Sequence, residues 1–314
     1  MANIFMMVLM VFVGAGMGVQ AGINSNLSKK VGSFEAGLVS TIGSSLICML
    51  LMLALRSGHL GAVASIPKWQ LIGGVCGSIM IFSTILCSPR IGSYAASILL
   101  ALGQLSCTII LDHFGLLGLN VRHIDVWRVL GFSLMICGAF SIFKKKLFAA
   151  PMPAQKAAPK TGNDFHIPKP LCVLMMIVGG CALGVQAAVN ASLSKHIGVY
   201  ESSFISTGIS MLSFLIIVLI QHQGKFRLVS TVPKWKLTGG LFGAAMVAST
   251  ILSTPHIGAY NASISMYLGQ LGCTMVLDHF GAFNMPVNKM DRWRVIGFIL
   301  MISGVICVYK STFI

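Results

Sequence analysis

Two nearly identical stretches of sequence decide the fold: GVQAGINSNLSKKVG at residues 18–32 and GVQAAVNASLSKHIG at residues 184–198. They lie 166 positions apart, and the same offset relates the two halves of the chain without a gap. Residues 83–115 and 249–281 are identical at 22 of 33 positions, and both segments end in Leu-Asp-His-Phe-Gly. The chain is therefore an internal duplication.

Charged residues are rare in this chain of 314 residues. They make up 9% of it, against roughly 25% in soluble domains, whereas 56% is hydrophobic and the mean hydropathy is +0.87. The apolar residues form blocks of about 20, the length that crosses a bilayer as a helix. This excludes a soluble globule and predicts an all-α polytopic membrane protein whose surroundings are the lipid bilayer. Because the net charge of +15 comes from helix ends and one linker, we expect no nucleic-acid partner.

Ten transmembrane helices are predicted, as two inverted five-helix repeats. The first repeat covers residues 1–143, a polar cytoplasmic linker covers 144–169, and the second repeat covers 170–314. The predicted spans are 4–27, 34–55, 69–88, 93–116 and 126–143, followed by 170–193, 201–221, 235–254, 258–283 and 292–310.

An odd number of spans in each half makes the second half enter the membrane in the opposite sense to the first. With the N-terminus outside, sixteen Lys and Arg residues are cytoplasmic and six are outside, as the positive-inside rule requires. We therefore predict that both termini lie outside. Residues 1–10 have neither a basic segment nor a small-residue cleavage site, so we expect a retained first span. Inverted repeats are the architecture of secondary transporters, with the binding site near the midplane.

The nine cysteines lie within apolar runs or at the start of one, and the sequence contains no Cys-x-x-Cys pair. This pattern is typical of packing residues and not of metal or redox sites. We accordingly expect no metal, no cofactor and no enzymatic activity.

Three repeated motifs resemble a known family: Gly-x-Gln-Ala-x-x-Asn-x-x-Leu at 18–27 and 184–193, Gly-Gln at 103–104 and 269–270, and Leu-Asp-His-Phe-Gly at 111–115 and 277–281. They are similar to the YdcZ-like branch of the drug/metabolite transporter superfamily, over both halves. That branch contains single five-span proteins and fused versions, and this chain resembles the fused form. The resemblance implies a transporter of the bacterial inner membrane with an undefined substrate.

The fourth predicted span of each half carries a polar stripe along one helical face. In the first half it consists of Tyr94, Ser97, Gln104, Thr108 and Asp112, and in the second half of Tyr260, Ser263, Tyr267, Gln270, Thr274 and Asp278. Polar groups in hydrocarbon need partners or water. The stripe therefore indicates either a cavity, which we favour, or hydrogen bonds between helices. Gln104 and Gln270 lie closest to the midplane and are the first candidates for contacts with a substrate.

A second pair of candidate sites lies toward opposite ends of the membrane. Gln20 and Asn24 are one helical turn apart, as are their equivalents Gln186 and Asn190. These amides are candidate gates or entry sites for a substrate, or alternatively satisfied groups near helix ends. Gly14, Gly18 and Gly22, spaced by four residues, indicate close helix packing.

The repeat also pairs six of the seven acidic residues. Asp125 and Asp291 directly precede predicted spans and fit helix N-caps. Asp112 and Asp278 lie near the C-terminal ends of their helices, where the dipole disfavours a negative charge. A raised pKa or a cationic partner is expected there, which makes these two residues the candidates for coupling protons or binding a cationic group.

These features predict a secondary-active transporter that moves a small polar or drug-like metabolite by alternating access. Uncharged amides and hydroxyls favour a neutral or zwitterionic substrate, with protons as a candidate coupling ion. The alternatives are a passive channel or structural scaffold and, less favoured, a membrane-embedded enzyme, which would need further ligands beside the Asp-His pairs. We expect a monomer or a weak homodimer. The substrate, its direction and the coupling ion do not follow from the sequence.

Overall fold

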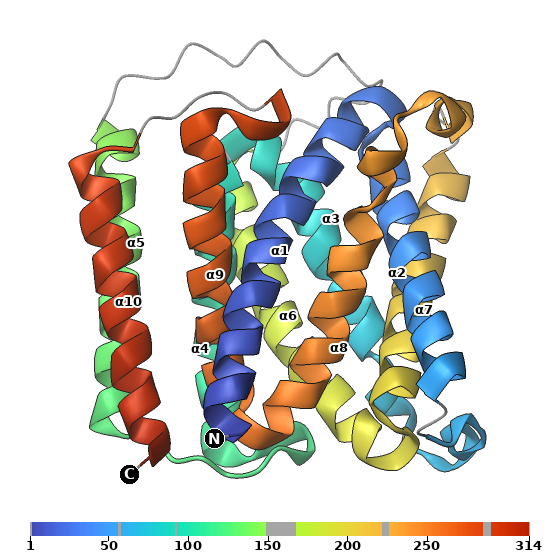
Figure 1. The fold of residues 1–314 in the computed structure, drawn as a ribbon, viewed down its shortest axis with the longest axis horizontal. Coiled ribbons are helices and arrows are strands. Elements are labelled where there is room, and N and C mark those ends of the chain that lie inside the picture. The colour runs from blue at the N-terminus through green and yellow to red at the C-terminus, as the bar shows by residue number, and fades with distance from the viewer. Residues whose placement is uncertain are drawn as a thin grey trace.

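The computed structural model describes residues 2–55, 58–91, 93–148, 168–221, 226–284 and 290–313. All regular secondary structure in these ranges is helical (Figure 1). The long α-helices of the first half are α1 (Ala2–Val31), α2 (Ser33–Leu55), α3 (Gly73–Ile91), α4 (Ser93–Phe114) and α5 (Val126–Phe148). Those of the second half are α6 (Lys169–Ile197), α7 (Val199–Gln221), α8 (Gly239–Ile257), α9 (Ala259–Phe280) and α10 (Arg292–Phe313). Short 3₁₀ helices occupy several connections, including η2 (Lys68–Leu71), η3 (Leu116–Gly118), η5 (Lys234–Leu237) and η6 (Ala282–Asn284).

Each of the ten predicted spans coincides with one of these α-helices, and no boundary differs by more than five residues. The third and eighth helices begin four residues later than predicted. In both places a Pro-Lys-Trp sequence precedes the helix, and its residues form the separate 3₁₀ turns η2 and η5. Proline fixes its own backbone and disfavours a helical residue before it, so the apolar stretch is divided there.

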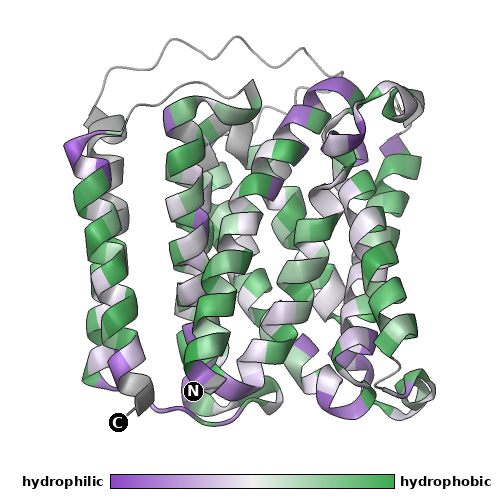
Figure 2. Cartoon of the chain, in the orientation of Figure 1, coloured by the Kyte–Doolittle hydropathy of each residue, from purple (hydrophilic) through white to green (hydrophobic). Residues whose placement is uncertain are grey.

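Seven helices have described segments that are long and apolar enough to cross a membrane: α1, α2, α4, α6, α7, α8 and α10. Hydrophobic residues cover the middle of the helices, and hydrophilic residues concentrate at both ends of the bundle (Figure 2). Large apolar side chains point outward, among them Phe12 and Ile220, each more than 70% exposed. Such a surface suits lipid, so the chain is a multi-pass membrane protein.

The two halves are interlocked. The first helix of each half packs on the third and fourth helices of the other, so α1 lies against α8 and α9 while α6 lies against α3 and α4. The second helices, α2 and α7, pack on each other. Neither half therefore has a separate core, because the main buried cluster contains residues of α1, α4, α6, α8 and α9.

Glycines allow the backbones to approach at these interfaces. A methyl group at Gly14 would collide with the carbonyl of Met266 on α9, and one at Gly180 would collide with the carbonyl of Leu100 on α4. One turn further along α1, Gly18 lies against the side chain of Cys273 on α9. The predicted packing role of Gly14 and Gly18 is confirmed.

The same contacts give the helix directions. Gly14 lies by Met266 and Gly18 by Cys273, so α1 and α9 run parallel. By contrast, Gln104 of α4 contacts Ser263 of α9, and Asp112 of α4 contacts Ala259, so α4 and α9 run antiparallel. These two helices are equivalent in the sequence repeat.

The fifth helices form a pair of their own. α5 and α10 pack mainly on each other and stand at one edge of the molecule (Figure 1). Their contact again uses glycines, with Gly131 against the carbonyl of Gly304 and Gly138 against that of Gly297. Each of these helices begins after an aspartate whose Oδ1 accepts a backbone N–H three residues later, at 2.8 Å for Asp125 and 3.0 Å for Asp291. Both predicted N-caps are confirmed.

Substitution of Gly14 by alanine tests the glycine contact. The added methyl group meets a backbone carbonyl that cannot move away easily, so we expect Gly14→Ala to lower the free energy of unfolding by about 1–3 kcal/mol. The control is Gly208→Ala on α7, where the methyl group would lie 3.8 Å from Ser45 Oγ, an ordinary contact. Equilibrium unfolding of the purified protein in detergent measures both. Equal stability of the two variants would contradict the packing described.

Candidate functional site

The polar stripes of α4 and α9 meet at the centre of the molecule. The side-chain amide of Gln104 donates from Nε2 to Ser263 Oγ at 2.8 Å, which joins the first half to the second. Both residues are buried, with Gln104 only 1% exposed. The equivalent residues of the repeat, Ser97 and Gln270, are half-buried. The structure thus brings together two of the predicted site residues, one from each half.

Other members of the stripes use their polar groups locally. Thr108 Oγ1 donates to the carbonyl of Gln104 at 2.9 Å, one turn back on its own helix, and Thr274 Oγ1 donates to that of Leu271 at 3.0 Å. The Tyr260 hydroxyl donates to the carbonyl of Arg128 at 3.3 Å. Tyr267 is only 1% exposed, and its hydroxyl has no hydrogen-bond partner among the described residues. Tyr94 was also predicted as a site residue, but its side chain is not among those that the structure describes.

The predicted amide pairs form two equivalent clusters. Gln20 and Asn24 of α1 donate to Ser40 Oγ of α2 at 3.2 and 3.3 Å. In the second half, Gln186 and Asn190 of α6 donate to Ser206 Oγ of α7, at 3.4 and 2.8 Å. Nothing in the sequence distinguishes Ser40 and Ser206 from neighbouring hydroxyl residues such as Thr207, whose Oγ1 donates to the carbonyl of Ser203 on its own helix at 2.8 Å. The sequence therefore did not identify these two serines as the partners.

Each amide cluster faces the start of a helix in the other half. A methyl group at Gly239, the first residue of α8, would meet Asn24 Oδ1, and one at Gly73, the first residue of α3, would meet Asn190 Oδ1. The two clusters lie toward opposite ends of α9. Asn26, next to the first cluster, donates to the carbonyl of Phe283 beyond the C-terminus of α9, whereas Ala191 and Gly258 line one cavity at its N-terminus.

A small cavity lies between α4, α6 and α8, close to the Gln104–Ser263 contact. Its volume of ≈ 10 Å³ holds about one water molecule. Its polar side chains are Gln104, Gln186 and Asn190, which were predicted as site residues, and Thr250. It is completed by the apolar residues Leu183, Ala187, Met246, Val247 and Ile251. The centre of the molecule is thus polar, but in this conformation it has no room there for a metabolite.

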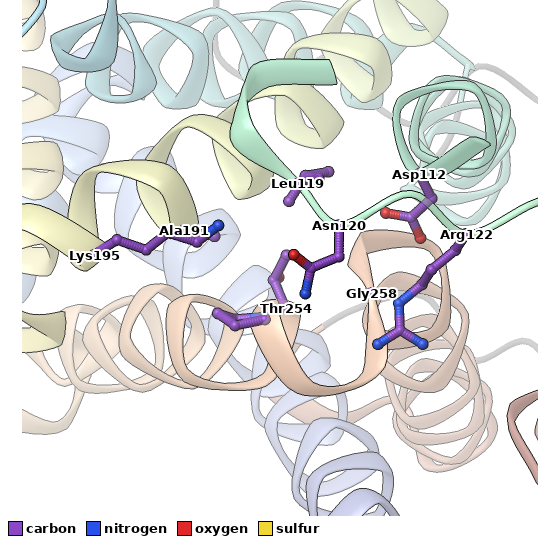
Figure 3. Close-up of a pocket in the computed structure, with 9 residues that line it drawn as sticks. Asp112, Leu119, Asn120, Arg122, Ala191, Lys195, Thr254 and Gly258 are labelled. Carbon is purple, nitrogen blue, oxygen red and sulfur yellow. The ribbon is translucent and has the colours of Figure 1, made fainter. Parts of the chain in front are cut away.

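Asp112 occupies a second cavity, also of ≈ 10 Å³, at one end of the bundle (Figure 3). Its two carboxylate oxygens accept the backbone N–H groups of Ala259 and Tyr260, each at 3.0 Å, and the residue is fully buried. The partner of this acid is therefore the N-terminus of α9, where the helix dipole stabilises a negative charge. The sequence predicted a raised pKa or a cationic partner for Asp112. The start of α9 was not predicted as its partner, because that helix belongs to the other half.

Basic groups surround Asp112 in the same cavity. Figure 3 shows Arg122 beside it and Lys195 on the far side, with Asn120 between. Arg122 donates from Nη2 to the carbonyl of His256 at 2.6 Å, and Lys195 donates to the carbonyl of Gly118 at 2.6 Å. Burial lowers the pKa of the Arg122 guanidinium, and the charge of Asp112 opposes that change. The side chain of Asp278, the equivalent of Asp112, lies outside the described residues.

One protein-family model matches both halves of the chain. The model of one family, described as "Putative inner membrane exporter, YdcZ", matches residues 5–141 and again residues 171–307. The chain belongs to the YdcZ family. Each half is one copy of the family unit, so the resemblance found in the repeated motifs is confirmed. The chain is accordingly a membrane protein of a family of inner-membrane transporters.

A likeness among solved structures extends over the whole fold. One chain, titled "Crystal structure of protein", superposes with a TM-score of 0.66 at 11% sequence identity, over 98% of this chain and 96% of the other. At that identity the likeness shows the fold alone. No curated protein matches this YdcZ-family sequence.

Replacing Asp112 by asparagine tests the contact with the start of α9. Asparagine keeps one acceptor oxygen and loses the charge and the second acceptor, so we expect the free energy of unfolding to fall by about 1–2 kcal/mol. The control is Asp125→Asn, because asparagine is as good an N-cap as aspartate. Thermal unfolding in detergent distinguishes the two variants. A loss of the same size in both would contradict the assigned role.

Proposed function

We propose that this YdcZ-family protein is a secondary-active transporter that moves a small polar or drug-like metabolite by alternating access between two inverted five-helix halves. The observation that carries the proposal is the buried Gln104–Ser263 hydrogen bond, which joins equivalent helices of the two halves at the centre of the molecule. Polar groups at the midplane between two repeats are typical of substrate sites in transporters.

Two further observations support inverted halves. The repeat is continuous over both halves, and the equivalent helices α4 and α9 pack antiparallel. All ten long helices then cross the membrane, with the linker in the cytoplasm and both termini outside. This orientation follows the distribution of Lys and Arg.

The amide clusters fit the role of gates. They occupy equivalent positions toward opposite ends of the bundle, and each is hydrogen-bonded within its own half and packs against a helix start of the other half. Opening one end requires that helix start to move away from its cluster, while the contact at the other end stays closed. In the conformation described the central cavity holds about one water, so a rearrangement of one half against the other has to precede substrate binding.

The polar groups at the centre are amides and hydroxyls. They offer both donors and acceptors and carry no charge, which favours a neutral or zwitterionic substrate over a multiply charged one. Gln104, Gln270 and Ser263 are the residues we assign to substrate contact.

Counterflow in proteoliposomes tests this proposal, with a panel of radiolabelled neutral amino acids and nucleosides as probes. The wild-type protein is expected to show saturable uptake that is stimulated by unlabelled solute inside, which a passive channel would not show. Gln104→Leu should reduce that uptake by at least tenfold, because it leaves Ser263 unpaired at the centre.

The matched control is Gln70→Leu. Gln70 of η2 makes the same kind of bond, from Nε2 to Ser192 Oγ at 3.2 Å, but at the end of the bundle. Uptake by this variant should stay within about twofold of the wild type. If the two variants transport equally well, or if no probe shows trans-stimulation, the assignment of the central site is wrong.

Asp112 is our candidate for coupling protons to transport. The contact with the start of α9 gives a physical route, since protonation would weaken a link between the halves. Asp112→Asn should then make the uptake rate insensitive to pH over the range in which the wild type responds. An unchanged pH profile would leave Asp112 with a structural role alone.

A further inference from the structure

The cavity between α4, α6 and α8 carries an unusual set of oxygen atoms. Its four polar side chains are almost fully buried: Gln104, Asn190, Gln186 and Thr250 are 1, 2, 6 and 8% exposed. One oxygen of each has no hydrogen-bond partner among the described residues: Gln104 Oε1, Gln186 Oε1, Asn190 Oδ1 and Thr250 Oγ1. Buried polar atoms without partners are rare in native proteins and require an explanation.

One N–H donor of each of the three amides is already used. Gln104 donates to Ser263, while Gln186 and Asn190 both donate to Ser206. Ser263 lies on α9 and Ser206 on α7, so the amide nitrogens are held by two different helices. The amide oxygens stay without a partner among the described residues. The site therefore offers three amide acceptors and one hydroxyl oxygen in a space of about one water molecule.

A water molecule donates two hydrogen bonds and the Thr250 hydroxyl a third, so a single water is one candidate occupant of the cavity. A cation is the other, since each of the four oxygens can direct a lone pair toward it. Neutral carbonyl and hydroxyl oxygens are the ligands by which membrane proteins hold dehydrated alkali ions. The cavity is lined by no carboxylate, whereas divalent ions are usually bound through carboxylates.

We propose that this cavity binds a small monovalent cation, with Na⁺ as the ion that fits its size and its uncharged oxygen ligands. The role of the ion as a coupling ion rests on the proposed transport function, whereas its binding rests on the cavity alone. A bound ion draws together α4 of the first half and α6 and α8 of the second. It also lies beside Gln104, so occupancy of the ion site and of the substrate site is linked through one side chain.

The repeat does not provide an equal site in the other half. The equivalent of Thr250 is Thr84, whose hydroxyl donates to the carbonyl of Met80 at 2.9 Å. Gln20 and Asn24 also have an oxygen without a partner among the described residues, but these two side chains and that of Gln270 are only half-buried. One ion site per molecule is therefore expected, and Thr84 provides a control of the same residue type.

Thermal unfolding of the full-length protein in detergent tests the proposal. NaCl is titrated against choline chloride at constant ionic strength, with KCl and methylammonium chloride as further arms. The wild-type Tm should rise with Na⁺ in a saturable manner, by about 5 °C at a hundred times the Kd. Stabilisation by methylammonium in place of Na⁺ would support the same cation chemistry and identify the amine group of a solute as its source.

Variants at Thr250 locate the effect. Thr250→Val removes the oxygen at nearly constant volume and should weaken the response to Na⁺ at least tenfold, while Thr250→Ser keeps the oxygen and the response. Thr84→Val should respond as the wild type does. Identical curves in Na⁺ and choline, or an unchanged response in Thr250→Val, would overturn the proposal. If Thr250→Val does not fold, ²³Na NMR of the wild type is the second measurement. A ²³Na line that does not broaden when the wild-type protein is added would overturn the proposal equally.

Counterflow measured in parallel separates this inference from the proposed function. Trans-stimulated uptake that is the same in Na⁺ and in choline would remove the coupling role of the ion and leave the transporter assignment intact. Absence of counterflow together with Na⁺-dependent stabilisation would support the ion site and contradict the transporter assignment.

Discussion

The glycines of α1 and α6 let each of these helices lie in backbone contact with the fourth helix of the other half. Inside a membrane, apolar side chains gain little from leaving lipid for protein, so close backbone packing is a main source of helix association. Here that contact, seen at Gly14 with Met266 and at Gly180 with Leu100, is made across the duplication and not within one copy. The remaining interfaces depend on it, because it places α4 against α9 and so brings Gln104 to Ser263.

The consequence for function is a polar centre that neither half forms alone. Gln104 comes from the first half, while Ser263, Gln186, Asn190 and Thr250 come from the second. A relative movement of the halves must change this set of contacts, whereas a movement within one half need not. The proposed ion site and the proposed substrate site share Gln104, which gives a direct physical means for one ligand to affect the affinity for the other.

The helices and the duplication could be predicted from the sequence, because apolar blocks of about 20 residues and a constant offset are local properties of the chain. The packing role of Gly14 and the N-caps at Asp125 and Asp291 were predictable for the same reason. Asp112 was recognised as unusual from its place on α4, but its partner is the start of α9, 147 positions away. Nothing in the sequence distinguishes Thr250, which lines the cavity, from its equivalent Thr84. Only the packing around each hydroxyl decides whether it donates to its own helix.

The central claim is that the two copies lie in the membrane in opposite senses, and it can be measured directly. Lys29 and Lys195 are equivalent in the repeat, and both are exposed. Each is replaced by cysteine in a protein without its native cysteines, and intact cells are treated with a membrane-impermeant maleimide. The account predicts labelling of the cysteine at position 195 from outside and protection of the one at position 29 until the membrane is opened. Labelling of both from the same side would contradict it.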